Sequence, residues 1–393
     1  MKILHIGKFY PVYGGVEKVM YDLCDGLSKA GIHSDFLGIN ADRKKTEITK
    51  INDLFTIYAV KSNSKIASTY ISPAMIWQLK KIKNNYDIVH IHHPDPMATL
   101  SLRLSDYKGI VICHWHSDIV KQKNILKFYK PLQTWMLNRS RLIIGTSPIY
   151  LKYSAFLKNY KNKLQLVPIG IPPVSHNILP ETVSNIRNKA GNRKIVFALG
   201  RLIYYKGIHV LIDAAKSLNE DICIFIGGKG PLESEFRRQI KENNLEDKVF
   251  LLGRIEDKDL PSYFSICDVF CLPSNERSEA FGIAQVEAMA YGKPVVATDI
   301  EGSGVSWVNK DGVSGYNVEI NNPTELSKKL NMILSDTVIY QRLSEGALQR
   351  YEHNFTQSKM VNETIKLYKS VLETSLFTIN TGHIKQARTN LIE

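Results

Sequence analysis

Residues 278–299 read SEAFGIAQVEAMAYGKPVVATD, which we interpret as a loop, a helix and a strand in that order. The segment IAQVEAMAY predicts a short helix, and Gly292 is a typical residue to end it. KPVVATD then predicts a buried strand. Glu279, on the loop, and Glu287, in the helix, have no other charged residue between them. The sequence therefore places two carboxylates near the start of one helix.

The same alternation of strand, loop and helix runs through most of the chain. The predicted strands are KILHIG, YDIVHIHH, GIVICHWH, RLIIGTS and LQLVPIG in the first half, and KIVFALG, DICIFIGG, KVFLLG, DVFCLPS and KPVVATD in the second. Continuous apolar strands between helices indicate a parallel sheet that is covered on both faces. We therefore predict an α/β protein with two Rossmann-like halves, joined by a proline-containing linker at about 171–193.

The composition is that of an ordinary globular protein. The chain has 393 residues, of which 44% are apolar and 23% charged, and this length suits two or three domains. The opening MKILHIGKFY is too short an apolar run for a signal peptide. No apolar run approaches the length of a membrane-spanning helix.

Metal-binding patterns are weak. Five cysteines lie mostly in apolar stretches without a CxxC motif, which is typical of reduced core residues in a cytosolic protein. A metal shared by Cys267 and Cys271 is the alternative, and packing is favoured because Cys271 falls within a predicted strand. Asp257 and Asp259 form a DxD pattern, for which helix capping is favoured over metal binding.

The net charge of +13 is concentrated in residues 121–163, which contain ten Lys or Arg and no Asp or Glu. The aromatic residues of this stretch are Phe128, Tyr129, Trp135, Tyr150, Tyr153, Phe156 and Tyr160. A basic stretch with interspersed aromatics favours contact with an anionic membrane surface. A solvated face above core aromatics is one alternative, and a nucleic-acid site is the other.

Charged residues follow the predicted strand KIVFALG. Arg201 and Lys206 precede the predicted helix GIHVLIDAAKSL, and parallel sheets bind ligands beyond the carboxyl ends of their strands. Two cations beside a helix start favour an anion such as a diphosphate, and two solvated loop charges are the alternative. After the next strand, Gly227, Gly228 and Gly230 would let the backbone approach a ligand closely.

The two glutamates suit the recognition of hydroxyl groups, because each carboxylate oxygen accepts strong hydrogen bonds. Glu279 and Glu287, taken with Arg201 and Lys206, describe a ligand with a diphosphate centre and a hydroxyl-rich group at each end. A nucleotide sugar has this composition. A structural ion pair between Glu287 and a lysine is the alternative.

Histidines gather after two predicted strands of the first half. His90, His92 and His93 follow one strand, and His114 and His116 follow another. Strand alternation puts His114 and His116 on the same side, and zinc binds such pairs. A ligand cleft at a strand end is also rich in polar groups, and we favour this interpretation, without a metal.

The motifs GRLIYYKG at 200–207 and EAFGIAQVEAMAYGKPVVATD at 279–299 resemble the retaining glycosyltransferases of family 4, with Glu279 and Glu287 matching the E-x7-E pattern. Further similar segments are GGVEK at 14–18, HSD at 116–118 and GSGVSWVNKDGVSGYNV at 302–318. The similarity therefore extends over nearly the whole chain.

The resemblance implies the GT-B fold, with two Rossmann-like, doubly wound parallel-sheet domains that face a cleft. The first domain would span residues 1–175 and bind the acceptor, and the second would span 190–365 and bind the nucleotide sugar. The last helix, within 366–393, would cross back and pack on the first domain.

The resemblance also implies roles for single residues. Arg201 and Lys206 would hold the donor diphosphate and neutralise the charge of the leaving group, so that no metal cofactor is needed. Glu287 would contact the ribose. His116 and Glu279 would be the catalytic residues, which position the transferred sugar and stabilise its oxocarbenium-like state. The leaving phosphate oxygen would take the acceptor proton on the same face.

Four more assignments follow from the resemblance. The backbone of Phe281, Gly282 and Ile283 would approach the sugar and phosphates, and Gly15 would approach the diphosphate once the domains close. The chain has Ser306 and Trp307 where many members carry a glutamate, and no catalytic role is assigned there.

We interpret the chain as a retaining hexosyltransferase that extends a lipid-linked glycan of a surface polysaccharide such as O-antigen or capsule. EGSGVSWVN at 301–309 resembles mannosyl- and rhamnosyltransferases, which favours a GDP-mannose-type donor over a UDP-hexose or UDP-N-acetylhexosamine. We expect the protein in the cytoplasm, peripheral on the inner face of the membrane, with no nucleic-acid partner. The alternatives are a nucleotide-sugar epimerase and a non-catalytic module that binds membranes or nucleic acid.

Overall fold

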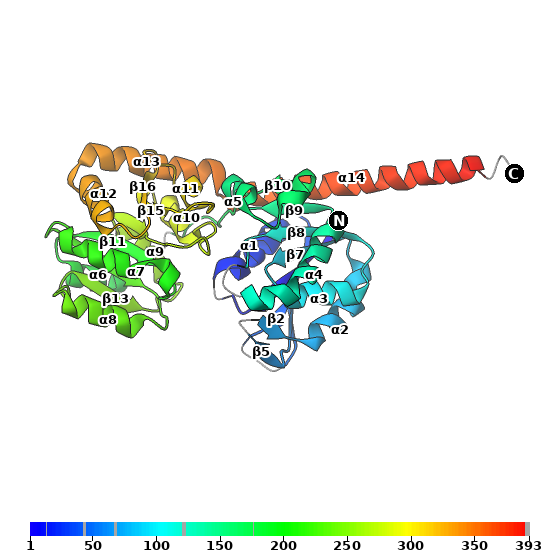
Figure 1. Cartoon of the computed structure of the whole chain (residues 1–393), viewed down its shortest axis with the longest axis horizontal. Coiled ribbons are helices and arrows are strands. Elements are labelled where there is room, and N and C mark those ends of the chain that lie inside the picture. Colours follow the sequence, from blue (N-terminus) through cyan, green and yellow to red (C-terminus); the bar gives the residue numbers. More distant parts are fainter. Residues whose placement is uncertain (13, 42–44, 67–68, 120–122, 176, 390–393) are drawn as a thin grey trace. The chain divides into compact units, whose positions relative to one another are not determined.

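The computed structural model describes residues 1–12, 14–41, 45–66, 69–119, 123–175 and 177–389, which form two compact units (Figure 1). The first unit contains Met1–Gly145, Phe156–Gly170 and Gln357–Glu393, and the second contains Thr146–Ala155 and Ile171–Thr356. The chain therefore passes from the first unit to the second twice, and it returns to the first unit at Gln357.

An eight-stranded sheet forms the centre of the first unit. Its strands lie in the order β10-β9-β8-β7-β1-β2-β4-β3, and the β3–β4 pair is antiparallel whereas the other pairs are parallel. The strands are β1 (Lys2–Tyr10), β2 (His33–Asn40), β3 (Glu47–Asn52), β4 (Phe55–Val60), β7 (Ile88–His93), β8 (Ile110–Trp115), β9 (Leu142–Gly145) and β10 (Leu164–Leu166). All six residues of β7 are buried, as expected for a strand of a sheet covered on both faces.

Five main helices surround this sheet. They are α1 (Gly15–Lys29), α2 (Pro73–Ile82), α3 (Pro96–Ser105), α4 (Lys123–Arg139) and α14 (Gln357–Thr389). Helices α1 and α14 pack against each other, and α3 packs between α2 and α4. A short hairpin of β5 (Ser64–Ile66) and β6 (Thr69–Ile71) precedes α2.

The second unit has a six-stranded, fully parallel sheet in the order β13-β12-β11-β14-β15-β16. The strands are β11 (Lys194–Leu199), β12 (Ile222–Gly227), β13 (Val249–Gly253), β14 (Val269–Leu272), β15 (Val295–Asp299) and β16 (Gly315–Glu319). Numbered within the unit, this is the order 3-2-1-4-5-6 of the Rossmann fold, in which the chain reverses direction between the first and fourth strands. Ligands of such sheets bind beyond the carboxyl ends of these two strands, here β11 and β14.

The second unit also contains α-helices. They are α5 (Pro148–Tyr153), α6 (Pro180–Ala190), α7 (Ile208–Ala214), α8 (Glu233–Glu242), α9 (Leu260–Ile266), α10 (Ile283–Ala290), α11 (Val305–Val308), α12 (Pro323–Ser335) and α13 (Thr337–Asn354). Gly292 follows Tyr291, the C-cap of α10, and has a φ of 66°, which confirms its predicted role at the end of this helix. The two predicted Rossmann-like halves are thus present.

Helix α14 completes the first unit, although it follows the second unit in sequence; it is the red helix of Figure 1. The amide of Gln357 donates to the carbonyl of Asp22 at 2.6 Å. A Cβ on Gly26 would lie 2.6 Å from the Val361 side chain, so only glycine permits this close approach of α1 and α14. Tyr368 is fully buried in the same unit.

One expectation from the sequence was wrong in part. Residues 171–193 were predicted as a linker, but Pro180–Ala190 form α6, whose Ile186 and Ala190 are buried. No helix among the described residues is both long and apolar enough to cross a membrane.

Candidate active site

The loops after β11 and β14 are in close contact at the carboxyl edge of the second sheet. Gly207 has a φ of 66°, and a Cβ at this position would lie 1.8 Å from the carbonyl oxygen of Pro273. The backbone N–H of Asn275 donates to the carbonyl of Tyr205 at 2.9 Å. Since only glycine tolerates both this conformation and this contact, Gly207 fixes the position of Lys206 relative to the second loop.

Lys206 and Glu279 form a direct ion pair across these two loops. The Nζ of Lys206 lies 2.5 Å from Oε2 of Glu279, and the two side chains are 17% and 10% exposed. The hydroxyl of Ser274 donates to the same oxygen at 3.0 Å. Burial opposes the charged form of Lys206, but Glu279 outweighs it and raises the pKa of the lysine. Both donors bond to Oε2, so Oε1 is left to accept from a ligand.

Two further contacts hold the backbone around Glu279. The hydroxyl of Ser303 donates to the carbonyl of Glu279, and the N–H of Gly304 donates to the carbonyl of Ala280 at 2.9 Å. The sequence reasoning missed Ser274 and Ser303, because serines in loops carry no signal by themselves. Only their spacing from the E-x7-E pattern could have drawn attention to them.

Arg201 is exposed, and none of the described acidic residues forms an ion pair with it. It follows β11 on the same loop as Lys206. The two cations predicted to bind one anion therefore differ: one is held by a carboxylate, and the other remains available to a ligand.

Glu287 and the segment Phe281-Gly282-Ile283 belong to the start of α10. Gly282 caps the helix with a φ of 77°, and Glu287 is half-buried in its second turn. The Phe281 ring is 3% exposed and packs on Phe355 at a centroid distance of 5.8 Å. The side chain of Phe281 therefore belongs to the core, which leaves only its backbone for a ligand.

The glycines after β12 approach other parts of the chain. A Cβ on Gly228 would lie 1.8 Å from the carbonyl oxygen of Gly200, and one on Gly230 would lie 2.2 Å from that of Leu202. These glycines pack the loop after β12 against the loop that carries Arg201. Their close contact is therefore with the protein backbone and not with a ligand.

In the first unit, Gly15 and His116 also lie at carboxyl ends of strands. Gly15 begins α1 after β1, is exposed, and has a φ of 57°. His116 directly follows β8 and is 4% exposed, and its backbone N–H donates to the carbonyl of His93 at 3.1 Å. The indole N–H of Trp115 donates to Asp118 at 2.8 Å, which orders the loop around His116.

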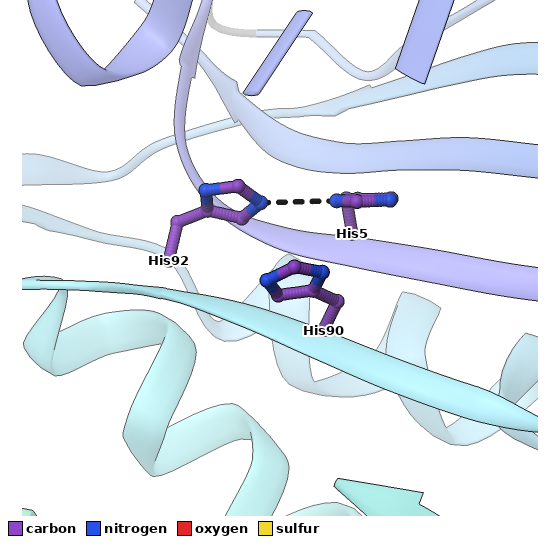
Figure 2. A group of neighbouring side chains, drawn as sticks. All are labelled: His5, His90 and His92. Atoms are coloured by element: carbon purple, nitrogen blue, oxygen red, sulfur yellow. Dashed lines mark hydrogen bonds between the residues drawn. The ribbon is translucent and has the colours of Figure 1, made fainter. Parts of the chain in front are cut away.

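Among the residues of the first unit whose burial is described, six histidines are buried, and burial is the main cause that lowers the pKa of each: His5, His90, His92, His93, His114 and His116. Strand register pairs His5 with His90 and His92 with His114. Two overlapping groups have ring nitrogens close enough to hold a metal ion: His5, His90 and His92, which Figure 2 shows, and His92, His114 and His116.

The basic stretch 121–163 is divided between the units, because residues 146–155 belong to the second unit. Tyr129 and Tyr150 are 6% and 1% exposed and are core residues. Lys163 donates to three carbonyls at the end of α4, and Arg139 donates to two carbonyls near β8. Part of this stretch is therefore structural, and its residues 121–122 lie outside the described residues.

Comparisons with known proteins agree with these features. Residues 13–174 match the family described as Glycosyltransferase Family 4, and residues 181–350 match the family described as Glycosyl transferases group 1. The chain is 36% identical over 380 residues to O-antigen chain mannosyltransferase C of Escherichia coli, with 95% of this chain and 99% of that protein covered. It is 29% identical over 359 residues to D-rhamnosyltransferase WbpZ of Pseudomonas aeruginosa, with 91% and 92% covered.

Among solved structures, the sucrose-phosphate synthase of Thermosynechococcus elongatus matches with a TM-score of 0.76 at 20% identity. The match covers 95% of this chain and all of the other. Both chains therefore share the GT-B fold, as the motifs predicted. The chain belongs to glycosyltransferase family 4, which confirms that it is a glycosyltransferase.

Proposed function

We propose that the protein transfers a hexose, with retention of anomeric configuration, from a nucleotide sugar to a lipid-linked glycan in O-antigen synthesis. The names of the two relatives, a mannosyltransferase and a rhamnosyltransferase, support a hexose and a polysaccharide of this kind. For the donor we propose the GDP-linked sugar of the mannose type that the motif at 301–309 favours. The observation that carries the proposal is the Lys206–Glu279 pair at the reversal point of a 3-2-1-4-5-6 sheet.

In the proposed complex, Arg201 and Lys206 bind the diphosphate of the donor. Arg201 suits this role because it is exposed and its guanidinium fork matches phosphate oxygens. Lys206 is charged and held in place by Glu279, so it stabilises developing negative charge without reorganising. The proposed reaction uses no metal, because these two cations neutralise the leaving group.

Glu279 and Glu287 bind hydroxyl groups in this proposal. Oε1 of Glu279 accepts from the transferred sugar while Oε2 stays bonded to Lys206 and Ser274. Glu287, in the second turn of α10, accepts from the ribose. The N-terminus of α10, with the backbone of Gly282 and Ile283, faces the phosphates with unpaired N–H groups.

In this proposal, Gly15 and His116 of the first unit contact the donor, and the first unit also binds the acceptor. His116 contacts the donor sugar, and the exposed backbone at Gly15 approaches the diphosphate. Exposed lysines of the basic stretch, such as Lys130, Lys158 and Lys161, hold the protein on the anionic inner face of the cytoplasmic membrane, where a lipid-linked acceptor lies.

A donor panel tests the proposal. The purified protein is incubated with GDP-mannose, GDP-rhamnose, UDP-glucose and UDP-N-acetylglucosamine, and released nucleotide is measured with and without lipid-linked acceptor. We expect acceptor-dependent release of GDP, which Glu279→Gln abolishes. The control is Glu256→Gln, since Glu256 is exposed and pairs with Arg254 on the neighbouring loop after β13. Release of UDP would show that the donor is a UDP-linked sugar and not a GDP-linked one. Formation of a new nucleotide sugar without release of nucleotide would indicate an epimerase.

A further inference from the structure

A continuous chain of hydrogen-bonding groups runs through the interior of the first unit. Nε2 of His116 lies 2.9 Å from Nδ1 of His92. Nε2 of His92 lies 3.0 Å from Nδ1 of His5, the contact drawn as a dashed line in Figure 2. Nε2 of His5 lies 3.4 Å from the hydroxyl of Tyr368 on α14. The same hydroxyl lies 2.5 Å from Nδ1 of His90. These hydrogen bonds thus connect His116, at the end of β8, to Tyr368 on α14.

The geometry of the links fits shared protons better than a metal. The rings of His92 and His116 have centroids 5.2 Å apart and planes only 11° apart, so they lie edge to edge with their nitrogens pointing at each other. A zinc ion between two nitrogens that point at each other would hold them about 4 Å apart, since each Zn–N bond is about 2.0–2.1 Å long. A separation of 2.9 Å is that of an N–H···N hydrogen bond.

Each imidazole in this chain is neutral, because burial lowers its pKa. A neutral imidazole has one N–H, which donates, and one bare nitrogen, which accepts. The tautomer of one ring therefore fixes the tautomer of the next. If Nε2 of His5 carries the proton, Nε2 of His92 and then Nε2 of His116 must carry it as well.

Tyr368 sets the direction, because it has a single hydroxyl proton for two histidines. His90 is the closer partner at 2.5 Å, and hydrogen bonds donated by a hydroxyl are shorter than those donated by N–H groups. The hydroxyl therefore donates to His90, and its oxygen accepts from Nε2–H of His5 at 3.4 Å. At the far end, Nδ1 of His116 has no hydrogen-bond partner among the described residues.

We propose that Tyr368, acting through His5 and His92, fixes His116 in the Nε2–H tautomer, so that its bare Nδ1 accepts a hydrogen bond from a sugar hydroxyl. Tyr368, His5 and His92 are then positioning residues for His116. A bare neutral nitrogen accepts from a hydroxyl and has nothing to donate to a phosphate, which assigns His116 to the sugar of the donor. The identity of the hydroxyl rests on the proposed function, whereas the tautomer does not.

Nitrogen NMR of the full chain labelled at histidine tests the tautomer without any substrate. We expect the Nε2–H form for His116 in the unmodified protein and a mixture of both forms in Tyr368→Phe. Among the described residues, His90→Leu leaves His5 as the only acceptor for the hydroxyl, so we expect it to reverse the tautomers of His5, His92 and His116 and give the Nδ1–H form of His116. The control is Tyr107→Phe. This change removes a buried hydrogen bond to Tyr86, which is not one of the residues linked to His116, and it leaves the tautomers unchanged.

Three results would overturn the inference. They are an Nδ1–H form of His116 in the unmodified protein, unchanged tautomers in both Tyr368→Phe and His90→Leu, and one equivalent of bound zinc by metal analysis. If the donor panel identifies a substrate, Tyr368→Phe should lower kcat about two- to tenfold at unchanged donor KM. This factor corresponds to the free energy of one neutral hydrogen bond. If no donor is turned over, the proposed function fails, and the NMR result still decides the tautomer.

Discussion

The ammonium of Lys206 and the carboxylate of Glu279 lie 2.5 Å apart, although the residues follow two different strands of the second sheet. The pair joins a group expected to bind phosphate to a group expected to bind sugar hydroxyls. A change at one residue therefore affects the charge and position of the other, and the two should behave as one unit in mutational experiments.

Breaking this pair should destabilise the second unit. Lys206→Met leaves the carboxylate of Glu279 buried without its cation, and we expect the free energy of unfolding to fall by about 2 kcal/mol or more. The double variant Lys206→Met/Glu279→Gln should lose clearly less than the sum of the two single changes, measured by urea unfolding. The exposed pair Arg254–Glu256 is the control, and its removal should cost less than about 0.5 kcal/mol. Additive effects at Lys206 and Glu279 would contradict the coupling.

The site should also depend on the hydroxyl of Ser274, which donates to Glu279. We expect Ser274→Ala to lower the transfer rate about two- to tenfold, because Oε2 of Glu279 loses one of its two donors. Steady-state kinetics with the preferred donor measures the effect. Ser262→Ala removes a buried serine that accepts from the N–H of Leu179 away from the site, and it should leave the rate unchanged. Equal losses in both variants would indicate a general effect of removing a buried hydroxyl.

Gly207 should tolerate no side chain. Its φ of 66° disfavours other residues, and a Cβ would collide with the carbonyl of Pro273 at 1.8 Å. We expect Gly207→Ala to lower the free energy of unfolding by about 3 kcal/mol or more and to weaken donor binding. Gly312 is the control, because it lies in the same unit, has a φ of 69°, and has nothing within 4 Å of the added Cβ. Gly312→Ala should cost only about 1 kcal/mol in urea unfolding.

The buried histidines should make stability depend steeply on pH. Burial lowers the pKa of each, to about 3 for His5 and for His114, from an ordinary value of 6.5. The unfolded chain therefore binds protons near pH 6.5 that the folded chain rejects, so stability is complete above this pH and is lost as the pH falls. Each histidine contributes about 1.4 kcal/mol per pH unit below its unfolded pKa.

Urea unfolding between pH 7.5 and 5 measures this slope, in a range where carboxylates still contribute little. We expect a loss of several kcal/mol between pH 6 and 5, since about six such groups act together. His90→Leu should reduce the slope by about one proton. A flat profile over this range would show that the histidines become protonated without unfolding.

The cations of the basic stretch should separate into two kinds. Lys163 donates to the carbonyls of Leu137, Asn138 and Ser140 at distances of 2.8–3.2 Å, so Lys163→Met should cost about 1–2 kcal/mol of stability. Lys158 and Lys161 are exposed, and changing both to Gln should leave stability within about 0.5 kcal/mol. Flotation with vesicles containing anionic lipid should be weaker for Lys158→Gln/Lys161→Gln than for the unmodified protein. Equal flotation of both proteins would exclude these lysines from membrane contact.

Local patterns were sufficient to predict the two Rossmann-like sheets and the family. Apolar stretches such as residues 222–227 give buried strands, and the residues around Glu279 form a pattern that is specific by itself. Helix α6 was missed because Pro172, Pro173 and Pro180 were interpreted as signs of a linker. Pro180 occupies the first turn of α6, where the missing N–H of proline has no consequence, and the buried Ile186 shows the helical spacing.

Contacts between distant residues could not be predicted in the same way. Lys206 and Glu279 are 73 positions apart, and their direct pairing depends on how two loops pack around Gly207. The sequence placed His114 and His116 on one side of a strand, but nothing in it linked them to Tyr368, which reaches His90 from 278 positions away. Such pairings depend on strand order and helix packing, which a single sequence does not specify.

Helix α14 supplies the surface on which α1 packs, through Val361 against Gly26 and through Gln357 against Asp22. During synthesis on the ribosome, the first 170 residues emerge long before this partner helix exists. The face of α1 that packs on α14 therefore stays uncovered, and accessible to chaperones or other nascent chains, until translation has passed the whole second unit. The order in which the ribosome makes the chain thus delays the completion of the unit that begins it.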